Sequence, residues 1–599
     1  MKNIALLITA VILSNFIFSQ EFETTTDYYK NGVKKSEGMM HLGREMGHWQ
    51  YFDSNGKLVR ETDYYKGELY GNDITYYPNG NKNEEFTFES NLKNGSYKNW
   101  YESGVLRTEG FYKYDVKDSS WTTYYNTGKP EMEVLYNQGS GRIISFYSPK
   151  NEKTVANGNG TVLRYYEFPS KLSEGSVADG LEQGLWTYYF ENGNIKETGT
   201  FDNGNRIGTW KGYYENKQLK SDINYENGKC VYYYENGTKE MEGIMKNKER
   251  DGEWVFWYPD GNIRSRNNYK SGVRNGIQEK YYSNGNLEAR INYIDGKKNG
   301  EAHWGLQDGK KDIDGNFVND VQEGLWTYWR TDGTKGNEGY YLNGEMSGKW
   351  TYWYGNGQVW RIINYEHGRK NGDYIVYYEN GNVFRKGQFE NDVEIGLWTE
   401  YYENSAKSLE GNYDFGVMTG LWNSWYDNGE KKSAIHYKNG LITDKALYYY
   451  PNGKIQIEEN YVVYENKGNP DLYGESREVS VLNGVTRTYN LKGTILMEGN
   501  YLLGKKTGKW TYYNPQGGKI RLENYKDDKP DGKWQGWYDH GVQEFEMNYK
   551  NGLLEGRMVT FDQQGNVEYD AIYRGNYEVE VKVNNNDPQK ENQRDDYRR

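Results

Sequence analysis

Residues 324–347 read GLWTYWRTDGTKGNEGYYLNGEMS, and the chain repeats this pattern every 24 residues. With Gly324 counted as position 0, glycine recurs at the same step along the sequence. The longest unbroken run is Gly252, Gly276, Gly300, Gly324, Gly348, Gly372, Gly396 and Gly420. With weaker copies included, about 22 repeats fill residues 23 to 575, and a period of this length predicts a repeat architecture.

Each repeat carries two turn signals. The first stands at positions 8 and 9, as in Asn356-Gly357, and the second at positions 19 and 20, as in Asn343-Gly344. Such pairs accept positive φ and favour two-residue hairpin turns. The chain is therefore expected to reverse twice per repeat. The predicted fold is all-β, an elongated array of stacked antiparallel β-hairpins that forms a meander or solenoid.

A turn at positions 8 and 9 predicts the pairing within each hairpin. Position 6 should lie opposite 11, position 2 opposite 15, and position 0 opposite 17. Position 2 is often tryptophan and position 15 often glycine, as in Trp326 and Gly339, so a large ring should cover a bare backbone. Position 17 is Tyr or Phe, as in Tyr341, and should cover the position 0 glycine in the same way.

The pairing also assigns two faces. Positions 2, 6, 11, 15 and 17 should form the packed face, with aliphatic residues such as Val359 at position 11. Positions 5, 12 and 14 should form the other face, where position 14 is frequently glutamate and position 5 is aromatic in nearly every repeat. The position 5 residues considered as candidate ligand-binding aromatics are Trp257, Tyr281, Trp329, Trp353, Tyr377, Tyr401 and Trp425. Because they recur almost without exception, packing is favoured over ligand stacking.

The N-terminus predicts export. Lys2, the apolar stretch 4–13 and the small residue Ser19 are typical of a secretory signal peptide, with cleavage expected near Ser19 or Gln20. The apolar stretch is shorter than the roughly 20 residues of a spanning helix, so no membrane insertion is expected after cleavage. The expected location is the periplasm or the outside of the cell.

Composition excludes some partners. The chain carries 86 acidic residues against 74 Lys and Arg, which gives a net charge of −12, and its basic residues form no dense run. Nucleic acid is therefore not expected as a partner.

The segments of the chain follow from the period. We expect a signal peptide over 1–19, repeats over 20–140, a degenerate repeat or bend over 141–159 and repeats over 160–461. An insertion loop should follow over 462–483, then repeats over 484–575 and a polar disordered tail over 576–599.

The pattern Gly-x-Trp-x-x-Tyr-Tyr-x-Asn-Gly followed by Glu-Gly-x-Tyr, seen nearly complete in 184–201 and 396–413, resembles the bacterial variant of the MORN repeat. The resemblance covers nearly the whole chain after the signal peptide. It implies stacked antiparallel hairpins and a scaffolding role, with some family members linked to lipids or protein partners and some bacterial variants labelled antitoxin-like.

No catalytic, cofactor-binding or metal-binding residue is predicted, and the protein is not expected to be an enzyme. The six histidines occupy different repeat positions, and none begins a metal-ligand pair at close spacing. Cys230 stands at the usual tryptophan position and is expected to be a small packed residue. Asp308, Asp312 and Asp314 lack the final glutamate of a calcium loop and are interpreted as turn residues.

Three functions remain open. The first is an exported, non-catalytic scaffold that mediates protein–protein interaction. The second is a glycan or cell-wall binder that uses the position 5 aromatic ladder. The third is antitoxin-like partner binding, which the export signal disfavours. The identity of the protein partner is not encoded in any motif.

Overall fold

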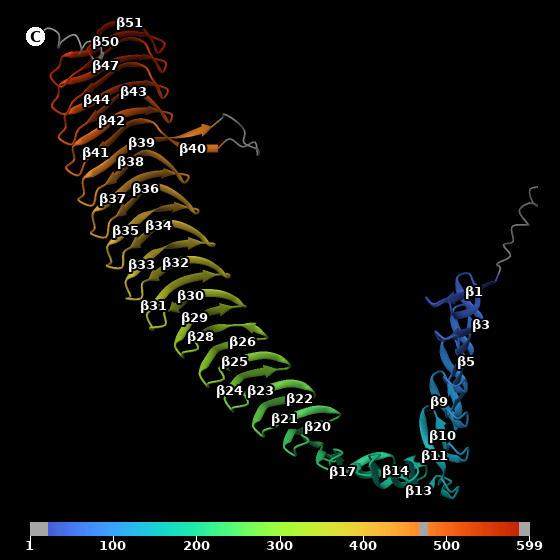
Figure 1. Cartoon of the computed structure of the whole chain (residues 1–599). Helices are drawn as coiled ribbons and strands as arrows, with labels where there is room; N and C mark the ends of the chain where they lie inside the picture. The colour runs from blue at the N-terminus through green and yellow to red at the C-terminus, as the bar shows by residue number, and fades with distance from the viewer. Residues whose placement is uncertain (1–21, 467–476, 586–599) are drawn as a thin grey trace, which may run out of the picture. The chain divides into compact units, whose positions relative to one another are not determined.

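The protein is all-β, as the repeat predicts. The computed structural model describes residues 22–466 and 477–585, and in these residues the chain forms 51 strands in one open antiparallel sheet, with no helix (Figure 1). Strands that follow one another in sequence are hydrogen-bonded neighbours, for example β28 (Gly324–Trp329) with β29 (Lys335–Leu342), and β29 with β30 (Glu345–Trp353). The hairpin meander is thereby confirmed. The signal peptide expected over 1–19 lies outside the described residues.

Contacts divide the chain into two compact units. The N-terminal unit comprises the described residues up to Gly276 together with Ser283–Gly285, and the C-terminal unit comprises Ile277–Tyr282 and the residues from Asn286 onward. The strands of the N-terminal unit used below are β7 (Leu92–Trp100), β8 (Leu106–Lys113), β9 (Val116–Tyr124), β10 (Pro130–Asn137), β11 (Ser140–Tyr147), β12 (Lys153–Ala156), β13 (Asn159–Glu167), β14 (Ser170–Ala178) and β15 (Leu181–Tyr189). Those of the C-terminal unit are β28, β29 and β30 with β31 (Val359–Glu366), β32 (Arg369–Tyr377), β33 (Val383–Glu390), β34 (Val393–Tyr401), β38 (Leu441–Tyr449), β39 (Ile455–Asn466), β40 (Arg477–Leu482), β41 (Gly484–Tyr489), β50 (Val567–Arg574) and β51 (Tyr577–Asn584).

The predicted register is correct over most of each hairpin. Gly324 pairs with Tyr341, and Trp326 pairs with Gly339, which are the expected pairs of positions 0 with 17 and 2 with 15. The second turn is also as expected, since Asn343 and Gly344 have φ of 51° and 84°. Two consecutive residues with positive φ form the tight turn whose twist suits a β-hairpin.

The register at the first turn was predicted wrongly. Trp329 at position 5, not the residue at position 6, pairs with Lys335 at position 11, and a shift leaves position 12 as a bulge. Of the turn pair only Gly333 has positive φ, at 93°, while the Asp332 carboxylate accepts a hydrogen bond from the Thr334 amide at 2.8 Å. The loop is therefore a three-residue turn closed by a glycine bulge.

This shift changes the assignment of faces. Positions 2, 4, 13, 15 and 17 share the packed face, which we call the core face, and positions 5, 11 and 14 share the opposite one, which we call the outer face. Position 11 therefore lies on the outer face and not on the predicted packed face, because the bulge at position 12 reverses the alternation of side chains. Val359, for example, pairs with the outer-face Trp353.

The tryptophans join each repeat to the one before it. A Cβ built on Gly339 would lie 2.1 Å from Cδ2 of Trp350, a residue of the following repeat, rather than against its own hairpin partner. The Trp350 indole N–H also donates to the Tyr340 carbonyl at 3.1 Å. The same ring-on-glycine contact occurs at Gly38, Gly110, Gly175, Gly199, Gly243, Gly315, Gly387, Gly411 and Gly499. Trp350 is 2% exposed, so this contact buries the largest side chain of the repeat.

The position 0 glycine has a different role from the one predicted. A Cβ on Gly324 or Gly348 would meet no atom within 4 Å, so no ring covers these residues. Both residues have positive φ, 74° for Gly324 and 62° for Gly348. Gly348 belongs to a β-bulge, because the pairing of β29 with β30 shifts its register at Gly339, which lies across from Gly348. Glycine is needed there because the bulge requires a left-handed backbone.

A hydrogen-bond ladder joins successive first turns. The tyrosine at position 6 donates its hydroxyl to the position 5 carbonyl of the following repeat, as Tyr354 does to Tyr377 at 2.7 Å and Tyr378 does to Tyr401 at 2.8 Å. We call this series the tyrosine ladder. It satisfies carbonyls that the strand pairing leaves free.

The irregular segments are more ordered than the sequence predicts. The degenerate segment 141–159 contains β11 and the four-residue β12. The segment 462–483 is not simply a loop, because β39 continues to Asn466 and pairs with β40, and only 467–476 lies outside the described residues. The tail was predicted to begin at 576, but Tyr577–Asn584 form β51 paired with β50, which was missed because this strand is exposed along most of its length.

Candidate functional site

The predicted aromatics occupy the outer face as a series of half-buried rings. Trp329, Trp353 and the other five candidates all have intermediate exposure. Trp257 belongs to the N-terminal unit and the other six belong to the C-terminal unit. Lysine ammonium groups lie within 5.8 Å of the ring centroids of Trp257, Trp329, Trp353, Tyr401 and Trp425.

Lysines at position 11 cover several of these rings. Lys335 Nζ lies 5.8 Å from the centroid of Trp329 and 5.6 Å from that of Trp353, and Lys311 Nζ lies 5.2 Å from Trp329. Lys335 also pairs with the Glu338 carboxylate at 2.6 Å. Cation–π contacts and an ion pair therefore connect the tryptophan rings, the lysine ammonium group and the glutamate carboxylate on the outer face.

The position 14 glutamates connect this set to the next repeat. Glu174 accepts hydrogen bonds from Lys171, at 2.8 Å, and from the hydroxyl of Tyr189 at position 5 of the following repeat. These bonds lower the pKa of Glu174, while burial and the bond to Glu174 raise the pKa of Tyr189 to about 12. The outer-face aromatics thus have partners inside the array.

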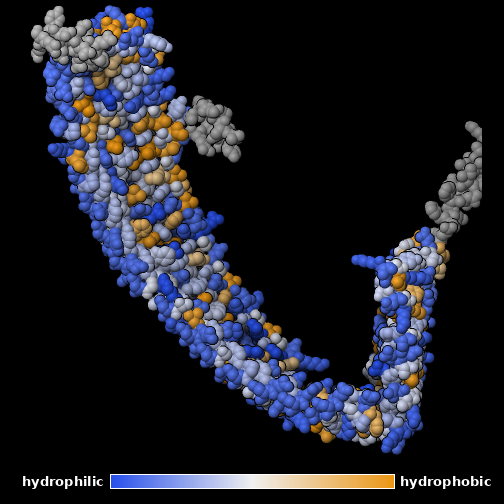
Figure 2. All heavy atoms as spheres, viewed as in Figure 1, coloured by the Kyte–Doolittle hydropathy of each residue, from blue (hydrophilic) through white to orange (hydrophobic). Residues whose placement is uncertain are grey.

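A row of exposed apolar side chains follows the second turns of the C-terminal unit, and we call it the turn-edge row. Its members have exposed fractions between 36% and 69% and are Ile294, Val318, Val321, Leu342, Val393, Phe415, Val417, Leu502, Leu503 and Leu553. Figure 2 shows apolar residues gathered along this margin, the one from which β39 and β40 project. Backbone bonds hold neighbouring turns together, as between the Gly344 amide and the Gln322 carbonyl at 3.0 Å.

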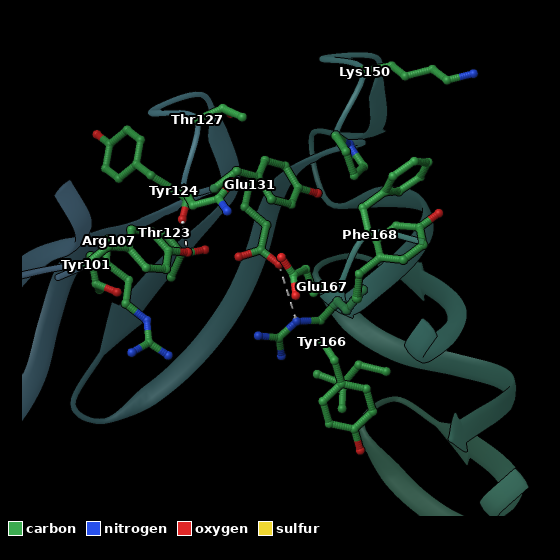
Figure 3. A pocket seen from close by; sticks show the side chains of 17 residues that line it. Tyr101, Arg107, Thr123, Tyr124, Thr127, Glu131, Lys150, Tyr166, Glu167 and Phe168 are labelled. Atoms are coloured by element: carbon green, nitrogen blue, oxygen red, sulfur yellow. Dashed lines mark hydrogen bonds and ion pairs between the residues drawn. The ribbon is translucent and has the colours of Figure 1, made fainter. Parts of the chain in front are cut away.

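The N-terminal unit contains a cavity of about 720 Å³, which we call the wedge pocket (Figure 3). It opens between three hairpin tips, those of β9–β10, β11–β12 and β13–β14. The residues that line it are Tyr101, Arg107, Thr108, Thr123, Tyr124, Tyr125, Asn126, Thr127, Glu131, Pro149, Lys150, Arg164, Tyr165, Tyr166, Glu167, Phe168 and Leu172. None was singled out from the sequence as a site residue.

The wedge forms for two reasons. Hydrogen bonds draw the hairpins together at the second-turn edge of the sheet, and one hydrogen bond of the tyrosine ladder is missing at the first-turn edge. At the second-turn edge the Ile143 amide bonds to the Gly180 carbonyl at 2.9 Å, and the Gly180 amide to the Gly158 carbonyl at 2.9 Å, which draws three hairpins together. At the tip edge Ser148 takes the place of the ladder tyrosine and instead accepts a bond from the Glu152 amide at 3.2 Å. The tips beyond it are therefore free to separate.

A dense core supports the wedge. Phe146, Val155 and Val162 are 1%, 0% and 2% exposed and pack with Trp186 and Trp210 in one cluster. A core packed in this way resists collapse of the neighbouring cavity. The pocket thus lies next to a well-packed core to which the irregular segment contributes Phe146 and Val155.

Glu131 lies at the centre of the pocket, between Tyr101 and Arg107 on one side and Phe168 on the other (Figure 3). Its side chain is 14% exposed and its carboxylate lies 3.7 Å from Nε of Arg164. Burial, and then the negative charge of Glu131, raises the pKa of Tyr101 and of Tyr125. The negative charge of Glu131 therefore acts on tyrosine hydroxyls of two different hairpins that line the cavity.

The described residues contain no group of three or more His, Cys, Asp or Glu side chains arranged to hold a metal ion. Within the same residues there is no helix of the length and apolar character needed to cross a membrane. Cys230 is buried, and burial raises the pKa of its thiol.

Solved structures similar to the chain match it at low sequence identity and low TM-score. The crystal structure of TcdB2-TccC3-Cdc42 is 11% identical with a TM-score of 0.13, over 92% of this chain and 30% of that one. The Photorhabdus luminescens Tc holotoxin pore with the TccC3-D651A mutation is 10% identical with a TM-score of 0.13, over 92% of this chain and 35% of that one. The chain thus spans about a third of the length of these structures. No curated protein sequence matches it.

The family model for the MORN repeat variant matches the chain in eleven segments. These are residues 47–66, 93–114, 117–138, 182–203, 206–227, 250–271, 274–295, 346–367, 370–391, 418–439 and 445–462. Each match coincides with hairpins of the 24-residue repeat. The protein, a β-hairpin repeat scaffold, belongs to the MORN repeat variant family.

Proposed function

We propose that the protein is an exported, non-catalytic scaffold that binds a protein partner in the periplasm or outside the cell. The observation that carries the proposal is the turn-edge row, a series of exposed apolar side chains along one sheet edge that is interrupted at polar turns such as 366–369 and 526–529. Extended apolar patches on a soluble surface mark protein interaction sites. A MORN repeat scaffold is consistent with a binding role.

The other surfaces of the repeat are engaged in stacking. Tryptophans of the core face cover glycines of the preceding repeat, as Trp350 covers Gly339. On the outer face, lysines cover the rings, as Lys335 covers Trp353. The turn-edge row is less engaged. Val321 and Val417 lie beside the turn glycines Gly344 and Gly440 of the next repeat, yet both remain 41% exposed, and Leu342 is 52% exposed.

Glycan binding along the outer-face ladder has less support, because a sugar ring would have to displace the lysines before it could stack on Trp329 or Trp353. An antitoxin-like role would require a cytoplasmic partner, and the predicted signal peptide argues against it. We therefore favour the protein-binding scaffold.

The experiment is site-specific photo-crosslinking in the native cell envelope. A photoreactive phenylalanine analogue at Leu342 or Val417 should yield a discrete adduct with one partner, identified by mass spectrometry. The control is the same analogue at Glu403, an exposed residue on the opposite, first-turn edge. Equal crosslinking from Glu403, or none from the turn-edge row, would contradict the assignment.

Export is tested separately. N-terminal sequencing of the native protein should find that the chain begins at Gln20 or Glu21, after loss of the signal peptide. An intact Met1 on a protein retained in the cytoplasm would remove the location and strengthen the antitoxin-like alternative.

A further inference from the structure

The wedge pocket presents an acceptor and a donor that the protein itself does not satisfy. Within the described residues, the Glu131 carboxylate makes no hydrogen bond, and Nε of Arg164 is buried without a hydrogen-bond partner. The two groups lie 3.7 Å apart, which is too far for a hydrogen bond between them. A buried donor left without a hydrogen bond costs free energy that a ligand can recover, and the neighbouring Glu131 carboxylate can accept a hydrogen bond from the same ligand.

A ligand hydroxyl is the group that can serve both. A hydroxyl donates one hydrogen bond and accepts others, so adjacent hydroxyls can donate to Glu131 while accepting from Arg164. Thr108 and Thr123 add two further hydroxyls to the lining. The polar part of the pocket therefore matches a polyol.

The walls around these groups are aromatic. Tyr101, Tyr125 and Tyr165 line the cavity, and Tyr165 packs edge-on against Phe168 with 5.2 Å between ring centroids. Apolar ring faces with a few converging polar groups are typical of small-molecule sites. The apolar C–H face of a sugar ring can lie on such walls.

The charges of the lining disfavour an ionic ligand. Arg107, Lys150 and Arg164 oppose Glu131 and Glu167, so neither sign dominates. A cationic side chain would meet the guanidinium of Arg164 beside its carboxylate partner, and an anion would meet Glu131. A neutral ligand avoids both costs.

Arg164 also lines a second cavity of about 310 Å³, together with Ser173, Glu182 and Tyr188 of the core face. The side chain of Arg164 is therefore shared by two neighbouring cavities.

From these observations we propose that the wedge pocket binds a neutral saccharide that presents adjacent hydroxyl groups to Glu131 and Arg164. This site is independent of the turn-edge row and of the proposed protein partner. It lies at the segment in which the repeat pattern lapses, and most of its lining comes from the repeats on either side.

The test uses the full mature chain and four neutral trisaccharides: maltotriose, cellotriose, N,N′,N″-triacetylchitotriose and mannotriose. Saturation-transfer NMR should detect binding of at least one of them, and calorimetric titration should give its affinity. Glu131→Gln and Arg164→Gln should each weaken that binding at least tenfold. Both variants should fold, because neither side chain has a hydrogen bond from the protein to lose, and thermal melts check this.

The matched control is Glu544→Gln, which changes a glutamate at the same repeat position as Glu131 in the C-terminal unit, away from the pocket. It should leave saccharide binding unchanged. Failure of all four trisaccharides to bind, or full binding by the Glu131→Gln variant, would overturn the proposal. So would binding of an oligolysine or oligoglutamate peptide in place of the saccharides, since the pocket would then hold a charged protein segment.

Discussion

The indole ring of Trp350 lies on the backbone of Gly339, a residue of the preceding repeat, so closely that a Cβ added there would come within 2.1 Å of the ring. Trp350 is 2% exposed and also donates its N–H to Tyr340. Each repeat therefore depends on its successor to cover its own backbone, which explains how hairpins that are marginal alone form a stable sheet.

Gly339→Ala should destabilise the array strongly, because the added methyl group would overlap the buried Trp350 ring, and the packing around that ring prevents it from moving away. Overpacking of this kind costs about 1–3 kcal/mol, and occasionally more. Urea unfolding followed by tryptophan fluorescence measures the loss. The control is Gly355→Ala, where a Cβ meets no atom within 4 Å and φ is not positive, and this variant should stay within about 0.5 kcal/mol of the wild type. Equal effects of the two changes would refute the ring-on-glycine account.

Replacing Trp329, Trp353, Tyr377 and Tyr401 together by alanine should lower the melting temperature. A fully buried ring costs about 3–5 kcal/mol to truncate, and these half-buried rings should each cost less while still adding up. The matched control is Lys349→Ala, an exposed residue of β30, which should melt like the wild type. An unchanged melt of the fourfold variant with loss of partner or glycan capture would instead mark these aromatics as a ligand platform.

Acid should weaken the outer face. The hydrogen bonds from Lys171 and Tyr189 hold the pKa of Glu174 below its ordinary value, and the pKa values of Glu61, Glu242, Glu458 and Glu546, at the same repeat position, are also lowered. A carboxylate whose pKa falls on folding contributes stability above its unfolded pKa, about 4.3, and loses it as the pH falls through the folded pKa. Urea midpoints should therefore drop between pH 5 and pH 3.

In the Glu174→Gln variant this pH dependence should be shallower than in the wild type, whereas Glu403→Gln, which changes an exposed glutamate of a hairpin tip, should leave it unaltered. A midpoint that rises on acidification would show that another set of groups controls the stability.

The insertion after β39 should be removable without harm to the sheet. Val462 pairs with Val481 as the residues flanking a regular second turn do, so Val463–Ser480 stand in place of a two-residue turn. Replacing Val463–Ser480 by Asn-Gly should restore the regular repeat and keep the melting temperature. If the segment contributes to partner binding, as its departure from the repeat sequence favours, partner capture should weaken. A large drop in melting temperature would show that the insertion stabilises the sheet. Undiminished capture of the partner would show that the insertion is not part of the binding surface.

The sequence predicted most of each hairpin because its signals are local. The pairs of Trp326 with Gly339 and Gly324 with Tyr341 follow from counting outward from a turn. The count failed at the tip, because Asp332-Gly333 is compatible with both a two-residue turn and a three-residue turn with a bulge. Which repeat supplies the ring over Gly339 could not be read from a register that describes one hairpin at a time.

The wedge pocket could not be predicted for a different reason. It depends on hydrogen bonds that join Ile143 and Gly158, in the stretch where the period gives no register, to Gly180 of the following repeat. One signal was available, namely Ser148 at a ladder position otherwise often held by tyrosine. That substitution marks a missing link between tips, although only the structure shows that a cavity opens beside it.

The stacking of each indole on the preceding repeat gives the array a chemical direction. If the chain is cut between Gly339 and Trp350, the N-terminal fragment ends in a bare glycine backbone and the C-terminal fragment begins with an uncovered indole. Truncation from the C-terminus should therefore yield soluble fragments more readily than truncation from the N-terminus, whose products expose a large apolar ring. The two ends of a shortened array are consequently not interchangeable. A repeat added at the C-terminal end must place its tryptophan on the glycine of the repeat before it, and a repeat added at the N-terminal end must offer its glycine to the tryptophan that follows.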